Sequence, residues 1–307
     1  MITNPKWQQE KLFSGSGPFI HLYTYPLEND ILLENDEDRT VTLNMIALVS
    51  RGMQVDVLAY ALMSNHIHLL LRGDEIQGRS FFEVLYRRLA RYMASRGKAG
   101  CLNKVTCGIT SITNLNSFRD EVAYIIRNPF VKREDVHLFS FIWCSGYLYF
   151  NSFISSTAGK SAEKVSYRES RMITRSSSDV IPSDFRIEGA LILPQSFVNY
   201  KLVEQLFDSA RQFLNWTLKN VEAQVEVAHA HGERPFLSDD ELFPLSRNLC
   251  EKLFSTRQPK ELALQQKKAL AMALRNQYHA SNGQLARLTT LSQQEVNDMY
   301  PLTLKQL

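Results

Sequence analysis

Two histidines stand one residue apart in an otherwise apolar segment, at His66 and His68. Side chains at positions i and i+2 of a β-strand point to the same face and lie about 7 Å apart along the chain. The two imidazoles can therefore share one divalent cation, while Ile67 between them points into a core. Because so short a pair arises easily by chance, two hydrogen-bonded structural histidines are the favoured interpretation of the pair taken alone.

A tyrosine and an asparagine stand four residues apart, at Tyr124 and Asn128, directly before Pro129. Residues i and i+4 are neighbours on one face of a helix. A phenol and an amide oxygen on that face could present a nucleophile and a third metal ligand together. Taken alone, the pair is more simply explained by a tyrosine that packs on a sheet and an asparagine in the last helical turn.

The hydrophobic pattern of the first half of the chain predicts alternating strands and helices. Strands are expected at residues 19–25, 55–63, 66–71 and 110–113, and helices at residues 42–50, 81–96 and 118–127. Ser117 is expected to cap the last of these helices and Pro129 to end it. The acidic run at residues 28–38 is expected to form a loop.

The composition of the chain changes after residue 152. Residues 153–184 are rich in serine, threonine and charged residues, which predicts a linker with a helix at residues 162–173. Residues 185–307 have helical periodicity. Because 307 residues are enough for two domains, we expect an α+β domain at residues 1–152, the linker and a mainly α-helical region.

The two pairs occur in an order that resembles the REP-associated tyrosine transposases and their insertion-sequence relatives, the single-tyrosine transposases of the HUH class. The pattern shared by that family is Met-Pro-Asn-His-x-His-Leu-Leu, then a basic helix, then Tyr-Ile-x-x-Asn-Pro. In this chain the pattern falls on residues 63–70, 81–96 and 124–129. The family's later Trp-Ser-Ser element falls on residues 143–145 as Trp-Cys-Ser, and the resemblance covers residues 15–152.

The chain departs from the family pattern at two places. Ser64 stands where the family has proline. The segment at residues 100–108 lacks the tryptophan or phenylalanine that family members commonly have before the tyrosine helix. The second departure concerns contacts with the substrate, whereas both histidines, the tyrosine and the asparagine are retained.

The resemblance implies a ferredoxin-like antiparallel sheet with helices on one face. It also implies that His66, His68 and Asn128 hold Mg²⁺ or Mn²⁺ and that Tyr124 is the nucleophile. Attack on single-stranded or hairpin DNA would give a 5′-phosphotyrosine and a free 3′-hydroxyl. Because the phosphotyrosine conserves the bond energy, strands can be rejoined without ATP, so no nucleotide cofactor is expected. Relatives include dimers, which leaves a homodimer open.

Alternatives from other classes remain open. A catalytically inactive, domesticated DNA-binding regulator would have the same fold. A histidine-triad hydrolase would need a third histidine where Leu70 stands. Two-histidine phosphoesterases need a second His-x-Thr or His-x-Ser, which neither His21 nor His137 begins. A structural zinc module would be favoured by nearby cysteines, but Cys101 lies beyond the predicted helix at residues 81–96.

Basic residues are concentrated between positions 79 and 104. Seven Lys or Arg residues stand there against one acid, Glu83. A block of one sign on a helix is either a solvated face or a surface that follows nucleic-acid phosphates, and both interpretations remain open. The candidates for contact with the DNA backbone are Arg87, Arg88, Arg91 and Lys98.

Charge and targeting signals set the expected compartment. The net charge is +3 and the isoelectric point about 8.6, which is compatible with nucleic-acid binding without requiring it. The first residues lack the pattern of a signal peptide, and no apolar run reaches the ~20 residues needed to span a bilayer. The four cysteines form no Cys-x-x-Cys pair. We therefore expect a cytoplasmic, nucleoid-associated protein with reduced thiols and no membrane contact.

A segment typical of a helix-turn-helix lies near the end of the sequence, at residues 281–299. Ser292 is expected to cap its second helix, which would enter the major groove of DNA. Gln293, Gln294 and Asn297 would then face base edges. An ordinary helical hairpin is the open alternative, because the second helix carries two acids and no Lys or Arg.

Overall fold

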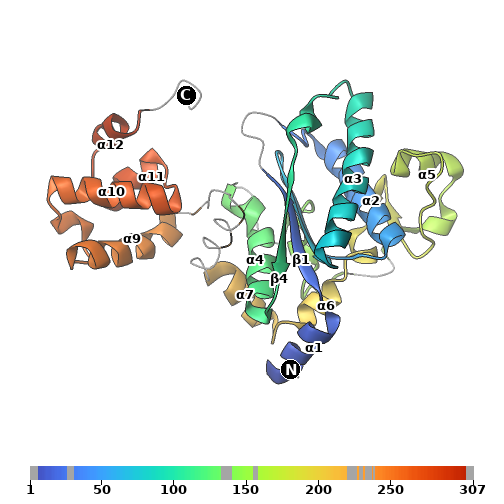
Figure 1. The fold of residues 1–307 in the computed structure, drawn as a ribbon, viewed down its shortest axis with the longest axis horizontal. Helices are drawn as coiled ribbons and strands as arrows, with labels where there is room; N and C mark the ends of the chain where they lie inside the picture. Colours follow the sequence, from blue (N-terminus) through green and yellow to red (C-terminus); the bar gives the residue numbers. More distant parts are fainter. Residues whose placement is uncertain are drawn as a thin grey trace. The chain divides into compact units, whose positions relative to one another are not determined.

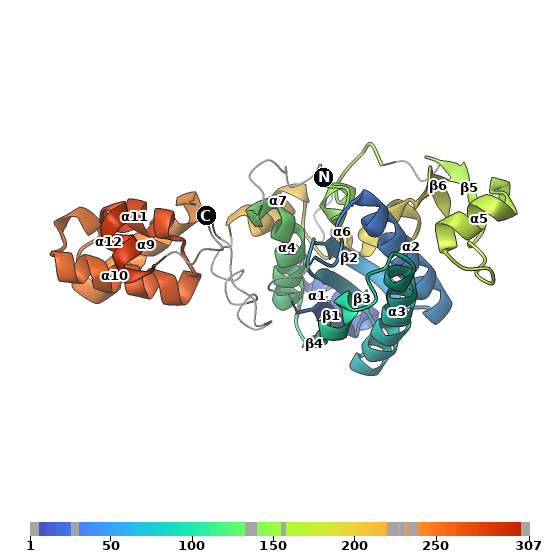
Figure 2. The same cartoon turned by 90° about the horizontal axis from the view of Figure 1, so that it is seen from above.

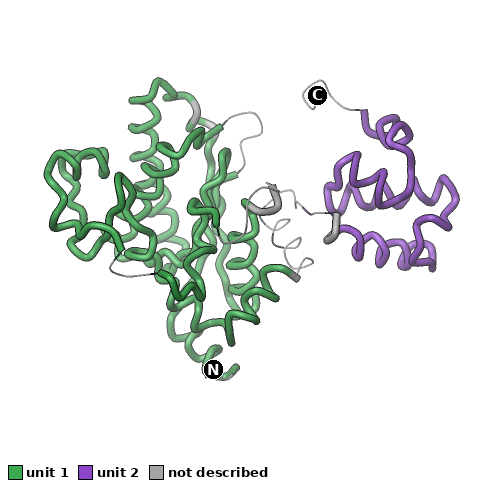
Figure 3. Tube along the Cα trace, turned by 180° about the vertical axis from the view of Figure 1, so that it is seen from behind, with its two compact units in different colours: residues 1–227 green, residues 228–307 purple. Residues whose placement is uncertain are grey.

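The computed structural model describes residues 6–25, 31–132, 140–154, 158–219, 227, 231, 237 and 239–301. The chain has an α+β fold, as the sequence predicts (Figure 1). It divides into two compact units, unit 1 at residues 1–227 and unit 2 at residues 228–307 (Figure 3). Within the described residues, every helix is too short or too polar to span a bilayer.

A four-stranded antiparallel sheet forms the centre of unit 1. Its strands are β1 (Phe19–Thr24), β2 (Asp56–Leu62), β3 (Ile67–Arg72) and β4 (Cys107–Ile112). Their order across the sheet is β2-β3-β1-β4. The helices of this part are α1 (Lys6–Ser16), α2 (Asp36–Met53), α3 (Glu75–Ser95) and α4 (Leu115–Lys132). The strands and helices predicted here are therefore present, with shifted ends.

Helices cover both faces of this sheet, whereas the sequence predicted helices on one face. Figure 2 shows α4 on one side of the strands and α2 and α3 on the other. On the α2–α3 face, Ile20 and Leu22 of β1 and Leu69 of β3 belong to one buried apolar cluster. On the α4 face, the rings of Phe19 and Phe118 lie 5.0 Å apart. Because alternation places apolar or aromatic side chains on both faces of β1, both faces need a cover.

Helix α2 begins within the run that was predicted to be an acidic loop. The Asn35 side chain caps the helix by accepting a hydrogen bond from Asp38 N at 3.0 Å. Acidic residues in a first turn also interact favourably with the helix dipole. The acids at residues 36–38 therefore start a helix, and residues 28–30 of the predicted loop lie outside the described residues.

Helix α4 differs from the prediction at both ends. Asn114 caps it instead of Ser117, because Ser117 N donates to Asn114 Oδ1 at 2.9 Å. The helix also continues past Pro129, which was predicted to end it. Since this proline lies in the last turn, the backbone hydrogen bond that it removes is at the helix end.

Most of the segment predicted as a linker, residues 153–184, packs on α2. It forms β5 (Lys160–Ser161) and α5 (Tyr167–Thr174), and β6 (Arg186–Glu188) and β7 (Leu191–Ile192) complete a second antiparallel sheet. Ile173, Ile181 and Phe185 are buried together with Ala47 and Leu48 of α2. A few apolar residues scattered among serines and charges are enough to dock the segment, which is why composition misled the prediction.

Unit 1 therefore extends beyond the domain predicted at residues 1–152. It continues through α6 (Tyr200–Gln205) and α7 (Ala210–Lys219). Helix α7 joins the sheet domain through α4, where Trp216 Nε1 donates to Asp120 Oδ1 at 2.7 Å. The boundary between compact units lies inside the predicted α-helical region, not before it.

The described part of unit 2 is helical. Its helices are α9 (Asp239–Phe254), α10 (Leu264–Tyr278), α11 (Asn282–Thr289) and α12 (Gln293–Met299). Ser292 caps α12 as predicted, with Glu295 N donating to its hydroxyl at 3.2 Å. The short 3₁₀ helices in the described part of the chain are Cys101–Lys104, Ser145–Leu148, Ala162–Lys164, Pro194–Ser196 and Pro259–Glu261.

A buried asparagine, Asn44, attaches residues 158–192, hereafter the docked segment, to α2. Its Nδ2 donates to Ala190 O at 2.8 Å and to Ile173 O at 3.3 Å. Its Oδ1 accepts from Ile192 N at 2.8 Å. One side chain thus satisfies backbone groups at the end of α5, in the turn before β7 and in β7 itself.

Asn44→Ala should lower the free energy of unfolding of unit 1 by about 1–3 kcal/mol, because the Ile192 N–H loses its acceptor in a buried position. Urea denaturation followed by circular dichroism measures the change. The matched control is Asn116→Ala, which truncates an exposed helical asparagine and should change the free energy of unfolding by less than about 0.5 kcal/mol. Equal unfolding free energies for the two variants would contradict the role of Asn44.

Candidate active site

Strands β1 and β3 place three rings on the α4 face of the sheet. The strands pair so that Tyr23 stands opposite His68, and His21 lies two residues from Tyr23 on the same face. On the other side of β1, Gly108 of β4 stands opposite Tyr23. A Cβ at Gly108 would lie 2.3 Å from Tyr23 Cζ, so only glycine leaves room for this ring beside the histidines.

A chain of hydrogen bonds joins four buried side chains from three elements. Glu121 Oε2 of α4 lies 2.7 Å from His21 Nδ1 of β1. His21 Nε2 lies 3.1 Å from His68 Nδ1 of β3. His68 Nε2 lies 3.1 Å from Asn128 Nδ2, which belongs to α4 again. Helix α4 therefore supplies both ends of the chain, and β1 and β3 supply its middle.

The carboxylate at one end sets the direction of these hydrogen bonds. An ionised Glu121 can only accept, so His21 donates from Nδ1. A neutral His21 then accepts at Nε2, which makes His68 Nδ1 the next donor. His68 Nε2 consequently carries a lone pair that faces the Asn128 amide. In this arrangement each imidazole has the Nδ1–H tautomer, and Nε2 of His68 can act as a metal ligand.

Tyr124 stands on α4 between Glu121 and Asn128, the two ends of this chain of hydrogen bonds. Its ring centroid lies 5.6 Å from that of His68 and 6.2 Å from that of His21. The side chain is buried. Tyr124 and Asn128 both lie against His68, as expected for residues four apart on one helix face.

His66 precedes β3, in the turn that joins β3 to β2. Its ring centroid lies 4.8 Å from that of His68, with the ring planes at 88°. Its Nδ1 lies 2.7 Å from Asn65 Oδ1, an acceptor that makes this nitrogen the donor and Nε2 the nitrogen with the lone pair. The structure therefore brings the two histidines, the tyrosine and the asparagine that the sequence singled out into one cluster around His68.

Two residues of this cluster, His21 and Glu121, were not predicted. A weak signal for each is present in the sequence. His21 alternates with Phe19 and Tyr23 on one strand face. Glu121 stands three residues before Tyr124, a spacing that shares a helix face. Neither spacing identifies the partner, because contact between β1 and α4 depends on how the helix crosses the sheet.

The donor atoms of the cluster suit a divalent cation. Asn128 Oδ1 is buried and has no hydrogen-bond partner, which is uncommon for a buried amide oxygen. The Asn128 amide lies against His68, with Nδ2 3.1 Å from His68 Nε2, so the oxygen of the same amide is within reach of an ion bound at that imidazole nitrogen. Two imidazole nitrogens and an amide oxygen are ordinary ligands for such metals. His21 and Glu121 would orient His68 from the side away from the metal, as in a carboxylate–histidine–metal arrangement.

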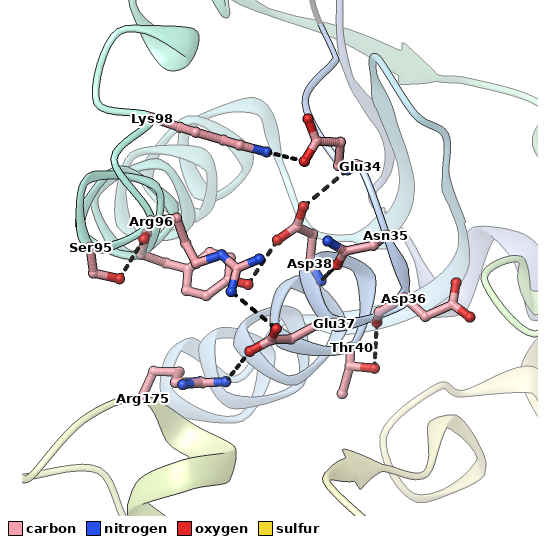
Figure 4. A network of polar contacts seen from close by, with 11 residues as sticks. Glu34, Asn35, Asp36, Glu37, Asp38, Thr40, Ser95, Arg96, Lys98 and Arg175 are labelled. Atoms are coloured by element: carbon pink, nitrogen blue, oxygen red, sulfur yellow. Dashed lines mark hydrogen bonds and ion pairs between the residues drawn. The ribbon is translucent and has the colours of Figure 1, made fainter.

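The basic residues of α3 and of the turn after it fall into two groups. Carboxylates from α2 and from the turn before α2 pair with the residues that follow α3: Lys98 with Glu34 at 2.5 Å and Arg96 with Glu37 at 3.2 Å (Figure 4). Arg88 pairs with Asp179 of the docked segment. By contrast, the candidate DNA contacts Arg87 and Arg91 are exposed, and neither forms an ion pair with a described residue.

The residues predicted to face DNA bases lie on α12. Gln293 and Gln294 are exposed. Asn297 is partly buried, and its Oδ1 accepts from Asn282 Nδ2 of α11 and from Gln293 Nε2, each at 3.0 Å. The amide of Asn297 is thus engaged in joining α11 to α12, whereas Gln294 extends from the surface.

Residues 143–145, which match the Trp-Ser-Ser element in part, support the sheet. Trp143 Nε1 donates to Asp36 Oδ1 at 3.1 Å. Ser145 Oγ accepts from Tyr60 N of β2 at 3.0 Å. Burial raises the pKa of the Cys144 thiol to about 12, so the thiol is protonated at neutral pH and is no nucleophile.

No protein-family model and no curated protein matches this chain. Among solved structures, the chain is similar to one described as a REP-associated tyrosine transposase bound to a REP hairpin. The similarity covers 43% of this chain and 78% of that chain, at 15% sequence identity and a TM-score of 0.33. A likeness of this extent carries no argument about function, which has to rest on the residues of the cluster.

The hydrogen-bonded chain predicts the Nδ1–H tautomer for both His21 and His68 in the metal-free protein. Long-range ¹H–¹⁵N correlation spectra of histidine-labelled protein measure the tautomer, with signals assigned from His21→Gln and His68→Gln. The exposed His279 gives a reference signal from outside the cluster. An Nε2–H pattern at either residue would contradict the proposed direction of these hydrogen bonds.

Proposed function

We propose that the chain is a metal-dependent nuclease and strand transferase for single-stranded or hairpin DNA, of the HUH tyrosine transposase class. The observation that carries the proposal is the meeting of two motifs sixty residues apart. Asn128 lies 3.1 Å from His68 Nε2, and the Tyr124 ring lies beside the same imidazole. Neither pair alone favours an enzyme, but a phenol, an amide and two imidazoles in one cluster are the groups that this chemistry needs.

We also assign the sheet to the ferredoxin-like arrangement. Strands and helices follow one another as β1-α2-β2-β3-α3-β4, with the antiparallel order β2-β3-β1-β4. A β-α-β-β-α-β succession is characteristic of that arrangement. Helix α4, which carries the tyrosine, is then an addition on the opposite face of the sheet.

In this proposal His66, His68 and Asn128 hold the cation, which is Mg²⁺ or Mn²⁺. When bound, the cation supplies Lewis-acid stabilisation of charge on a phosphate oxygen. The partnerless oxygen of Asn128 supports its assignment as a ligand. The Nδ1 contacts of both histidines support ligation through Nε2.

Tyr124 forms the covalent bond to DNA. Its phenolic oxygen attacks a phosphodiester phosphorus, a P–O bond to the tyrosine forms, and the bond from phosphorus to the 3′ oxygen breaks. The phenol loses one proton and the leaving 3′ oxygen takes up one, so the products are a 5′-phosphotyrosine and a 3′-hydroxyl. Reversal of the same step by another 3′-hydroxyl joins strands without ATP.

His21 and Glu121 act as positioning residues for His68. The His21 ring accepts from His68 Nδ1, and Glu121 in turn accepts from His21. Such outer contacts fix the ring orientation of a ligating histidine and raise its basicity. Both residues are buried, so the arrangement is held by the packing of α4 on the sheet.

In this proposal the exposed arginines of α3 bind the phosphates of the DNA strand. Arg87 and Arg91 can approach phosphates without displacing a carboxylate, whereas Arg88 and Lys98 would have to exchange one. We further propose that α11 and α12 form a helix-turn-helix that binds duplex DNA through Gln293, Gln294 and Asn297. A protein with these contacts would be nucleoid-associated, and a homodimer is compatible with it.

Tyr124→Phe should abolish a covalent protein–DNA adduct. Wild-type protein, Mn²⁺ and labelled hairpins from the flanks of its own gene are expected to give a band that survives denaturing electrophoresis. The variant lacks the attacking oxygen, so its adduct should fall below detection. The matched control is Tyr167→Phe, at an exposed tyrosine of α5, which should form the adduct at the wild-type level.

A wild-type protein that binds these hairpins tightly but neither cleaves them nor forms an adduct would overturn the nuclease proposal. That result would favour the inactive DNA-binding regulator. An adduct that persists in Tyr124→Phe would instead show that another nucleophile acts.

Mn²⁺ binding should depend on the ligands and on their support. His68→Ala should remove measurable binding, and His21→Ala should weaken it by about 10–100-fold because His68 loses its orienting partner. His21→Gln, which retains an acceptor, should recover part of the affinity. Isothermal titration calorimetry measures these affinities, with His279→Asn as the control at an exposed histidine.

Unchanged Mn²⁺ affinity in His68→Ala would contradict the metal site. Loss of binding in His68→Ala together with wild-type affinity in His21→Ala would leave the metal site standing and contradict the positioning role of His21.

A further inference from the structure

A pocket of about 580 Å³ lies where the docked segment meets α2 and α3. It is separate from the histidine cluster in its lining residues and belongs to unit 1. It is lined by Arg88, Arg91, Arg171 and Arg175, by serine and threonine side chains, and by Met45 and Tyr92. Four arginines and five hydroxyl side chains of serine and threonine in one hollow are a setting for an anion.

Two ion pairs hold the rim of this pocket in place. Arg175, directly after α5, reaches Glu37 of α2 at 2.7 Å (Figure 4). Arg88 of α3 pairs with Asp179, and both side chains are largely buried. The turn at residues 175–179 is therefore attached to both helices, so a ligand would meet a largely preformed site.

Two further arginines, Arg91 of α3 and Arg171 of α5, form no ion pair with a described residue. The Arg171 guanidinium lies 5.8 Å from the centroid of the Tyr167 ring. The pocket thus has four cationic side chains against the two carboxylates that pair with Arg88 and Arg175. This excess of two positive charges comes from elements far apart in the sequence, which distinguishes it from a run of charge on one helix.

The floor of the pocket is apolar and fixed. Met45 and Tyr92 are both buried. The Tyr92 hydroxyl donates to Asp38 Oδ1 at 2.8 Å, which holds the ring, and the Arg175 guanidinium lies 5.8 Å from its centroid. A floor of low polarity strengthens the attraction between the arginines and an anion above it.

We propose that this pocket binds a phosphate ester, with Arg91 and Arg171 as its ligands. Guanidinium groups bind phosphate oxygens through paired hydrogen bonds, and hydroxyl groups such as Ser177 add further donors. The volume falls within the range of pockets for nucleotide-sized ligands. The phosphate ester is either a backbone phosphate of a DNA strand or a free mononucleotide, which share this chemistry. The site does not rest on the chemistry of Tyr124.

The test compares two double variants with the same change of charge, each made in the full chain with Tyr124→Phe so that no adduct forms. Arg91→Ala with Arg171→Ala removes the two ligands. Arg168→Ala with Arg211→Ala removes two exposed arginines outside the pocket. The probes are a fluorescent oligothymidylate of about 15 nucleotides, thymidine 5′-monophosphate and inorganic phosphate.

We expect the pocket variant to lose affinity for one source of phosphate by about tenfold or more, and the control variant to stay within about twofold of the parent. If the source is the DNA backbone, strand binding weakens, and the slope of log affinity against log salt falls in magnitude by about 1.4 for the two lost contacts. If the source is a free nucleotide, saturable binding of the monophosphate or of phosphate disappears while strand binding is unchanged.

Identical behaviour of the pocket and control variants towards all three probes would overturn the proposal. Thermal melting of each variant checks that the fold is intact, and Arg91→Lys with Arg171→Lys keeps the charge while removing the paired hydrogen bonds. Because adduct formation by Tyr124 is measured separately, failure of the pocket and failure of the proposed nuclease give different results.

Discussion

The burial of both faces of β1 and β3 is the constraint on which the rest of unit 1 depends. A buried polar side chain is costly unless a partner satisfies it. His21 and His68 are fully buried on the α4 face, where their ring nitrogens contact each other and the side chains of Glu121 and Asn128 from α4. Glu121 and Asn128 satisfy the two ends, so polar contacts, together with the packing of Phe118, fix where α4 crosses the sheet.

The two faces of the sheet have different roles. The α2–α3 face is an apolar cluster, and its burial contributes hydrophobic stabilisation. The α4 face places an ionisable network beside Tyr124, so its geometry depends on the apolar face that keeps the strands in register. Helix α2 has a further role, because its outer side, at Ala47 and Leu48, carries the docked segment. The segment thereby contacts α3 on the side of the sheet opposite the histidine cluster.

Local periodicity could predict the parts of the site that lie within one element. The spacing of Tyr124 and Asn128 placed both on one helix face, next to His68. The spacing of His66 and His68 predicted that the two imidazoles lie together, although His66 is in the turn before β3 and not on the strand. The contribution of His21 could not be predicted, because it follows from the register of β1 against β3 and from the path of α4. The same limit applies to the fold. Strands and helices were predictable from hydrophobic periodicity, but the helices on both faces and the docking of residues 158–192 depend on contacts distant in sequence.

The basic stretch of α3 illustrates why charge in a sequence is an incomplete guide to binding. A carboxylate and a phosphate compete for the same guanidinium, so an arginine already paired contributes little net attraction. Arg88 and Arg96 have such partners from other elements, whereas Arg87 and Arg91 form no ion pair with a described residue. The same basic stretch therefore contains both arginines that are paired with carboxylates and exposed arginines that form no ion pair with a described residue. The distinction is set by α2 and by the docked segment, which supply carboxylates to some positions and a second arginine, Arg171, beside Arg91.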